Sequence, residues 1–131
     1  MNTAVLAAYR PQVLSLLRFM SGLLLLQHGC LKLLDFPANH PPAVVFGNLM
    51  WFGGLIELVC GVLLAIGLFT RPAAFLASGF TAVAYFMVHW ARGFYPILNG
   101  GELAVLYSFV FLYLTFAGPG PISVDAKRGA E

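Results

Sequence analysis

The chain has 131 residues, of which 60% are hydrophobic and only 9% are charged, and its formal net charge is +2. A soluble domain carries about 25% charged residues, so these few charges cannot cover a water-exposed surface of this size. The small positive charge is also too scattered to indicate nucleic-acid binding. We therefore expect one domain whose apolar surface faces the lipid bilayer.

Four apolar segments are candidates for membrane helices, each of which needs about 20 mostly apolar residues. Pro11 precedes the first segment and suits a first helical turn. The sequence thus predicts an all-α, integral membrane four-helix bundle in a single domain over residues 1–131. The expected helices span about residues 12–34, 44–69, 72–91 and 99–117.

The expected connections are short. Residues 35–43 form a loop with three prolines and His40, and Thr70 and Arg71 form a tight turn, which makes the second and third helices antiparallel neighbours. The polar tail after Pro121 is expected to lie in water. We expect the first apolar segment to be retained as a membrane helix, because no clear small-residue cleavage site follows it.

The basic residues near the helix ends predict the orientation of the chain, because cytoplasmic loops carry an excess of Lys and Arg. One side of the membrane would carry more of these basic residues than the other, and we expect this richer side to be cytoplasmic. This predicts a multi-pass protein with both termini in the cytoplasm. The richer side holds Arg10, Arg71, Lys127 and Arg128, and the other holds Lys32 and Arg92.

Ionisable residues within the apolar segments are the main functional signal. A charge at the bilayer centre costs at least about 2.5–3.5 kcal/mol, so such residues usually face the bundle interior and pair with one another. They comprise Arg18, His28 and Lys32 in the first helix, Glu57 in the second, His89 in the third and Glu102 in the fourth.

Helical spacing places most of these residues in one layer. With a rise of 1.5 Å per residue, Glu57, Tyr85, Glu102, His28 and His89 lie about 18–26 Å from the cytoplasmic ends of their helices. This layer falls in the outer half of the bilayer. Small residues four positions before and after the glutamate, Gly53 and Gly61, would let another helix approach closely.

Arg18 is the exception, because it lies only about 10 Å from the cytoplasmic end of its helix. Its side chain could reach up toward Glu57 or down toward the lipid headgroups. On the fourth helix, the run from Asn99 to Glu102 is typical of a helix cap, which favours an ionised glutamate.

Two interpretations of this layer remain open, and they are compatible. In one, the charges neutralise each other and fix the register of the helices. In the other, they surround a polar pocket, where Glu57 and Glu102 would transfer protons as the catalytic pair. The expected ligand-binding residues are His28, His89, Arg18, Lys32, Tyr85 and Asn99.

No cofactor motif is evident, and a quinone is the ligand that the pocket interpretation favours. Two facing histidines could also hold haem axially, but a histidine hydrogen-bonded beside a glutamate is commoner, so haem b is a minor alternative. No ligand spacing supports a metal site. Cys30 and Cys60 lie in apolar runs and are interpreted as small apolar residues.

Several segments together resemble the DoxX family of small bacterial membrane proteins, in one order over nearly the whole chain. The resemblance is carried by Arg18, Gln27-His28-Gly29-Cys30-Leu31-Lys32, Phe52-Gly53-Gly54-Leu55-Ile56-Glu57-Leu58-Val59-Cys60-Gly61, Gly67-Leu68-Phe69-Thr70-Arg71, Ala84-Tyr85-Phe86, His89, Asn99-Gly100-Gly101-Glu102, Gly118-Pro119-Gly120 and Ser123-Val124-Asp125.

The resemblance implies four transmembrane helices in the bacterial inner membrane. It also implies a redox-associated role, because the family is named for similarity to a subunit of a thiosulfate:quinone oxidoreductase, and other members are linked to thiol-handling and oxidative-stress assemblies. A complete thiosulfate-oxidising site is not expected in this polypeptide alone, because it has no second domain and no evident sulfur-relay cysteine.

Three functional hypotheses follow. The first is a quinone-linked or thiol- or sulfur-linked membrane subunit that acts with a partner, as an oxidoreductase subunit if it is an enzyme at all. The second is a non-enzymatic anchor or stabilising subunit of a larger complex. The third is a small-molecule or proton transporter built from an oligomer. The expected partners are the lipid bilayer, other membrane subunits or further copies of the chain.

Overall fold

The computed structural model describes residues 3–37 and 44–129, and all regular structure within these stretches is helical. The predicted all-α class is thereby confirmed, whereas the predicted loop residue His40 lies outside the described residues. The elements are α1 (Thr3–Leu34), α2 (Leu49–Ile66), α3 (Thr70–Ala84), the π-helix η1 (Tyr85–His89), the 3-10 helix η2 (Trp90–Arg92), α4 (Pro96–Asn99), α5 (Glu102–Ala117) and α6 (Val124–Lys127).

Within the described residues, three helical stretches are long and apolar enough to cross a membrane. They are α1, α2 and the continuous run Thr70–Arg92, which comprises α3, η1 and η2. The α5 helix is also apolar but shorter, with 16 residues. Large apolar side chains are exposed along all of these helices. In water this surface would be unstable, so the chain is a membrane protein in contact with the lipid bilayer.

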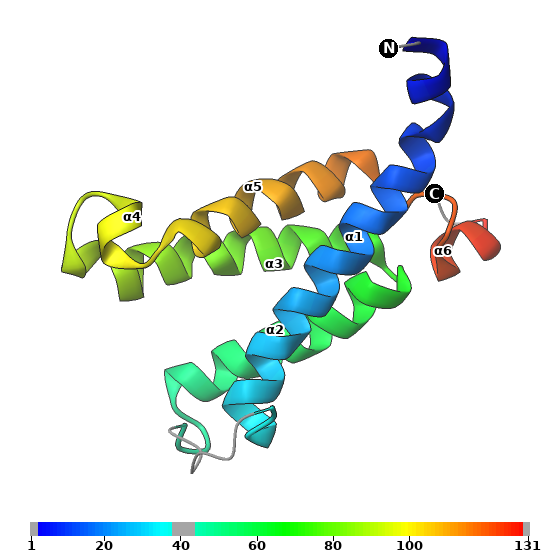
Figure 1. Ribbon diagram of the computed structural model, residues 1–131. Helices are drawn as coiled ribbons and strands as arrows, with labels where there is room; N and C mark the ends of the chain where they lie inside the picture. Colours follow the sequence, from blue (N-terminus) through cyan, green and yellow to red (C-terminus); the bar gives the residue numbers. More distant parts are fainter. Residues whose placement is uncertain (1–2, 38–43, 130–131) are drawn as a thin grey trace.

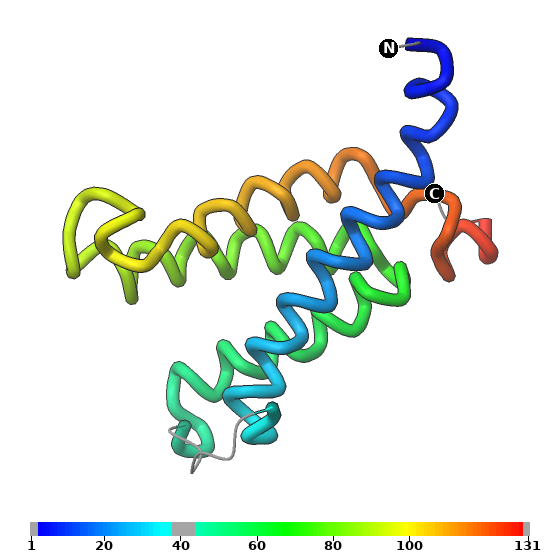
Figure 2. The backbone as a smooth tube through the Cα atoms, in the orientation of Figure 1, coloured from blue at the N-terminus to red at the C-terminus, as the bar shows by residue number. Residues whose placement is uncertain are grey.

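The long helices pack as two pairs. Figure 1 shows α1 crossing α2 closely, and α5 lying alongside α3. The pairs meet near the connection between α2 and α3 and diverge toward their other ends, as the backbone trace in Figure 2 also shows. We call the meeting point the closed end and the diverging ends the open end.

Glycines allow the close approach of α1 to α2. A Cβ atom added at Gly29 would lie 2.4 Å from the backbone nitrogen of Leu58, and one added at Gly61 would lie 2.6 Å from the backbone of Leu26. The predicted close approach at Gly61 is therefore confirmed. By contrast, Gly53 faces the Phe80 ring of α3, not α1. Small residues on both helices thus bring the backbones of this pair into direct contact.

Helix ends differ from the expected bounds for local reasons. The α2 helix begins at Leu49 because the side chain of Asn48 accepts a hydrogen bond from the backbone N–H of Trp51. It ends at Gly67, which adopts the left-handed conformation with φ 70°. The tight turn therefore precedes Thr70, which is already the first residue of α3. Pro11 lies inside α1, not in its first turn.

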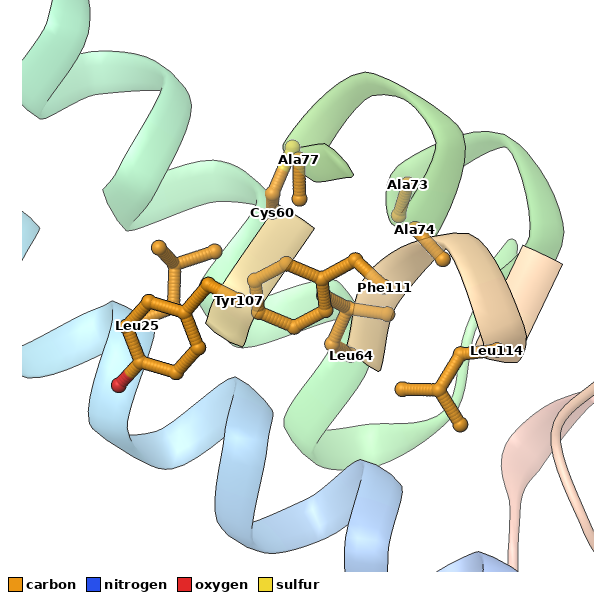
Figure 3. Close-up of a cluster of buried hydrophobic side chains, with 9 residues drawn as sticks. All are labelled: Leu25, Cys60, Leu64, Ala73, Ala74, Ala77, Tyr107, Phe111 and Leu114. Carbon is orange, nitrogen blue, oxygen red and sulfur yellow. The ribbon is translucent and has the colours of Figure 1, made fainter. Parts of the chain in front are cut away.

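The apolar core lies between the two pairs. Figure 3 shows Tyr107 and Phe111 of α5, which stack on each other, directed toward Leu25, Cys60 and Leu64 of the other pair. Cys60 is buried and carries a free thiol, as expected of a small apolar residue. Small residues of α3 complete the cluster and let α2 and α5 each pack close to α3, namely Ala73, Ala74 and Ala77.

At the closed end, Arg18 is 2% exposed and binds backbone carbonyls from two other parts of the chain. Its Nη1 donates to the carbonyls of Leu64 and Ala65 at the end of α2, and its Nε donates to the carbonyl of Pro119 over 2.8 Å. Its Nη2 donates to the carbonyl of Ile122. A cation at these free carbonyls is favourable for the helix end.

The tail after α5 also folds back onto the closed end, so the prediction that it lies in water is wrong for Ser123 and Asp125, which are both 5% exposed. The Asp125 carboxylate accepts hydrogen bonds of 2.9 and 2.8 Å from the backbone N–H groups of Phe69 and Thr70. It thereby caps α3, whose own N-cap residue offers no side-chain acceptor. We call the contacts of Arg18 and Asp125 the clasp.

Candidate functional site

A cleft of about 300 Å³ lies between the diverging helix pairs, and we call it the open cleft. Residues from α1, α2, α3, η1 and α5 line it, so its shape depends on how the two pairs are placed relative to each other. Most of its wall is apolar, with a few polar side chains, as in most small-molecule sites. The polar side chains are His28, Lys32, Glu57, Thr81, His89 and Tyr107.

A larger hollow of about 420 Å³ lies beside Arg18 at the closed end. Volume alone would favour it as a binding site. However, the guanidinium of Arg18 is already held by four backbone carbonyls, and most of the remaining wall is apolar. The open cleft is the stronger candidate because several titratable groups converge on it.

Lys32 and Glu57 form an ion pair across the α1–α2 interface. The Nζ of Lys32 lies 2.7 Å from the Oε1 of Glu57, and their side chains are 23% and 9% exposed. The second oxygen, Oε2, is covered by protein and accepts no hydrogen bond. A buried polar atom without a partner costs about 1–3 kcal/mol, so this carboxylate has an unmet demand for a donor.

His89 is oriented by the loop that leads to α5. Its Nδ1 lies 3.2 Å from the backbone carbonyl of Asn99. Because a carbonyl can only accept, Nδ1 carries the hydrogen in this contact, and Nε2 of the neutral ring is left as an acceptor. The Asn99 side chain is itself fixed, since it donates to the carbonyl of Gly93 and accepts from the N–H of Gly101, each over 2.8 Å.

Tyr85 lies behind His89. The two rings stack with their centroids 6.3 Å apart, and the Tyr85 hydroxyl lies 3.3 Å from the Nδ2 of Asn99. Tyr85 and His89 both belong to the π-helical turn η1, and such turns are frequent at functional sites. Tyr85 and Asn99 thus hold His89 in place, and neither lines the open cleft.

His28 and Tyr107 come from opposite pairs and meet at the cleft. Their rings make an edge contact with centroids 6.2 Å apart. The pattern that identifies Tyr107 in the sequence is its spacing of four from Leu103 and from Phe111, which places it on the inward stripe of α5. The sequence analysis did not identify this tyrosine, because its neighbours on this stripe of α5 are apolar and no charged residue lies among them.

The structure brings four of the eight predicted site residues to the open cleft: His28, Lys32, Glu57 and His89. Arg18 reaches neither Glu57 nor solvent, because its hydrogen bonds hold it at the closed end. Glu102 is exposed at the first residue of α5 and does not line the cleft. Among the described residues, no three His, Cys, Asp or Glu side chains are grouped so that they could hold a metal ion.

Comparisons with known proteins support the family resemblance seen in the sequence. The family model described as DoxX matches residues 13–90. An uncharacterized protein from Haemophilus influenzae is 44% identical over 127 residues, which cover 93% of this chain and 95% of that protein. No solved structure matches.

Proposed function

The chain belongs to the DoxX family, and we propose that it is a redox-associated membrane subunit whose open cleft binds the head group of a quinone or of another small oxidisable molecule. The observation that carries the proposal is the convergence of His28, Lys32, Glu57 and His89 on one cleft between apolar walls. A flat, lipid-soluble ring with polar oxygens fits such a cleft, because apolar walls bind the ring and the polar groups bind its oxygens.

The proposed chemistry assigns separate tasks to the cleft residues. Interconversion of a quinone and a hydroquinone moves two electrons and two protons, so ionisable groups beside the ring are needed. Glu57 would accept or deliver a proton, while His28 and His89 would hydrogen-bond the ligand oxygens. A partner protein with a redox cofactor would exchange the electrons. Glu102 has no part in this proposal, because it does not line the cleft.

We propose that the chain crosses the bacterial inner membrane several times, with both termini in the cytoplasm. The closed end would face the cytoplasm because it gathers the basic residues: Arg71 donates to the carbonyls of Thr115 and Phe116 there, and Lys127 and Arg128 follow on the returning tail. The open cleft would then lie in the outer half of the bilayer, where lipid-soluble molecules can reach it. A reporter enzyme that is active only in the periplasm, fused to the C-terminus, should therefore be inactive.

A cleft-filling substitution tests the proposal without altering any charge. Ala84 lines the open cleft, so Ala84→Phe should abolish saturable binding of a short-tailed quinone or hydroquinone to the purified chain in lipid nanodiscs. Ala91→Phe is the matched control, because Ala91 is exposed and does not line the cleft. Equal binding by both variants, or no binding by the unmodified chain, would contradict the proposal.

The ion pair between Lys32 and Glu57 supports a second candidate, a non-enzymatic subunit that stabilises a larger complex. The pair joins α1 to α2, so its charges could act only in helix pairing. Glu57→Gln and His89→Ala distinguish the candidates in cells. Loss of quinone-linked activity at an unchanged protein level supports the ligand site, whereas loss of protein with unchanged activity per molecule supports the structural role.

A further inference from the structure

We propose that the open cleft binds the reduced, hydroxyl-bearing form of its ligand, a hydroquinone or a similar dihydric phenol, more tightly than the oxidised quinone. This inference rests on the proposed function and adds the chemical form of the ligand. A hydroquinone and its quinone share one ring and differ in their oxygens, which donate hydrogen bonds in the first and only accept them in the second. The polar groups of the cleft therefore decide between them.

Glu57 provides the first acceptor. Its Oε1 is engaged by Lys32, but its Oε2 is buried without a hydrogen-bond partner. An ionised carboxylate cannot donate, so only a donor can satisfy this oxygen. Because Oε2 is covered by protein, the whole carboxylate must shift toward the cleft before a ligand can reach this oxygen. The flexible side chain of Lys32 can follow Oε1 in this shift, and a ligand hydroxyl would supply the bond that Oε2 lacks.

His89 provides the second acceptor. Its Nδ1 donates to the carbonyl of Asn99, which leaves the lone pair of Nε2 on the neutral ring. Asn99 is 2% exposed and held by three hydrogen bonds, so the imidazole has a fixed partner that specifies its tautomer. Glu57 and His89 thus line one cleft from opposite helix pairs, and each carries an acceptor atom that no protein donor engages.

The oxidised quinone would present carbonyl oxygens to these acceptors. Such a ligand satisfies neither of them, and burying unpaired polar groups is what makes hydrogen-bonding sites selective. Lys32 retains N–H groups beyond the one in its ion pair, and the hydroxyl of Tyr107 can also donate to a quinone oxygen, so binding of the quinone is weakened and not excluded. We therefore expect a preference of about tenfold for the hydroquinone, which is about 1.4 kcal/mol.

The experiment compares the two oxidation states of one molecule. A decyl-tailed benzohydroquinone and the same molecule in its oxidised form are titrated calorimetrically, without oxygen, into the full chain in lipid nanodiscs. Glu57→Gln is the test variant, because its amide adds an N–H donor and removes the charge. Glu102→Gln makes the same chemical change on an exposed carboxylate that does not line the cleft.

The unmodified chain and Glu102→Gln should both prefer the hydroquinone about tenfold, and Glu57→Gln should bind the two forms about equally. Should Glu57→Gln fail to fold, the double variant Lys32→Met/Glu57→Gln removes both members of the ion pair and should show the same loss of preference. Equal or tighter binding of the quinone by the unmodified chain overturns this inference but leaves the proposed function in place. Failure to bind either form overturns both.

Discussion

The two ends of the molecule use their polar residues in opposite ways. At the closed end, the Arg18 guanidinium donates to four backbone carbonyls, and Asp125 accepts from two backbone N–H groups. At the open end, one oxygen of Glu57 has no hydrogen-bond partner, and the ring of His89 turns an acceptor nitrogen away from its backbone contact. Charges at the closed end therefore hold distant chain segments together, whereas at the open end one acceptor atom of Glu57 and one of His89 are left available.

This difference shows why buried charges cannot be interpreted as one class. A charge whose partners are backbone groups of distant segments acts as a crosslink, because removing it leaves several polar groups unsatisfied. A charge with one side-chain partner and a free acceptor can exchange that partner for a ligand. The clasp supplies a fixed joint, and the helix pairs diverge from this end, as Figure 1 shows. The open cleft lies between the diverging pairs.

The largest expected effect comes from breaking the clasp at Arg18. Arg18→Leu leaves the carbonyls of Pro119 and Ile122 without this donor and frees the returning tail. We expect the free energy of unfolding in detergent to fall by about 3–5 kcal/mol. Arg10→Gln is the control, because Arg10 is exposed, and its effect should stay within about 0.5 kcal/mol. An equal loss of unfolding free energy in both variants would show that the clasp does not hold the closed end together.

A smaller effect tests whether α1 and α2 remain tightly packed even near the open end. Gly29→Ala places a Cβ atom 2.4 Å from the backbone nitrogen of Leu58, so the helices must separate, which should cost about 1–3 kcal/mol. Gly79→Ala is the matched change on α3, where the added atom meets nothing within 4 Å. It should stabilise the helix by about 0.5–1 kcal/mol. Thermal unfolding of the two variants side by side measures the contrast, and similar melting temperatures would contradict tight packing.

The smallest effect concerns the pH dependence of the clasp. Burial acts to raise the pKa of Asp125, but hydrogen bonds from Thr70 and Phe69, with the nearby charge of Arg128, outweigh it, so the pKa lies below its usual value. A lowered folded-state pKa stabilises the protein fully above the unfolded value of about 3.9, and this stability is lost as the pH falls through the lower folded value.

Asp125→Asn should therefore cost about 1 kcal/mol near pH 7, since it weakens the cap of α3. The difference in melting temperature from the unmodified chain should shrink as the pH falls below about 4. A difference in melting temperature between the two proteins that stays constant from pH 3 to pH 7 would show that the carboxylate is not ionised in the clasp.

The sequence predicted the helical class from long apolar segments, because hydrophobicity along the chain is visible without any tertiary contact. It also identified four residues of the open cleft, because a buried ionisable group is conspicuous in an apolar helix. It did not find Tyr107, because an aromatic residue in an apolar helix is unremarkable until its neighbours are known.

The sequence by itself determined that this chain is helical, lies in a membrane and carries ionisable groups within its apolar helices, because hydrophobicity is a local property. Only the tertiary structure decided what those groups contact. Arg18 and Glu102 were assigned to the site from their positions along single helices, but the contacts of Arg18 with the returning tail depend on residues about 100 positions away. Helical periodicity carries no information on such contacts, since they arise from how the two helix pairs meet.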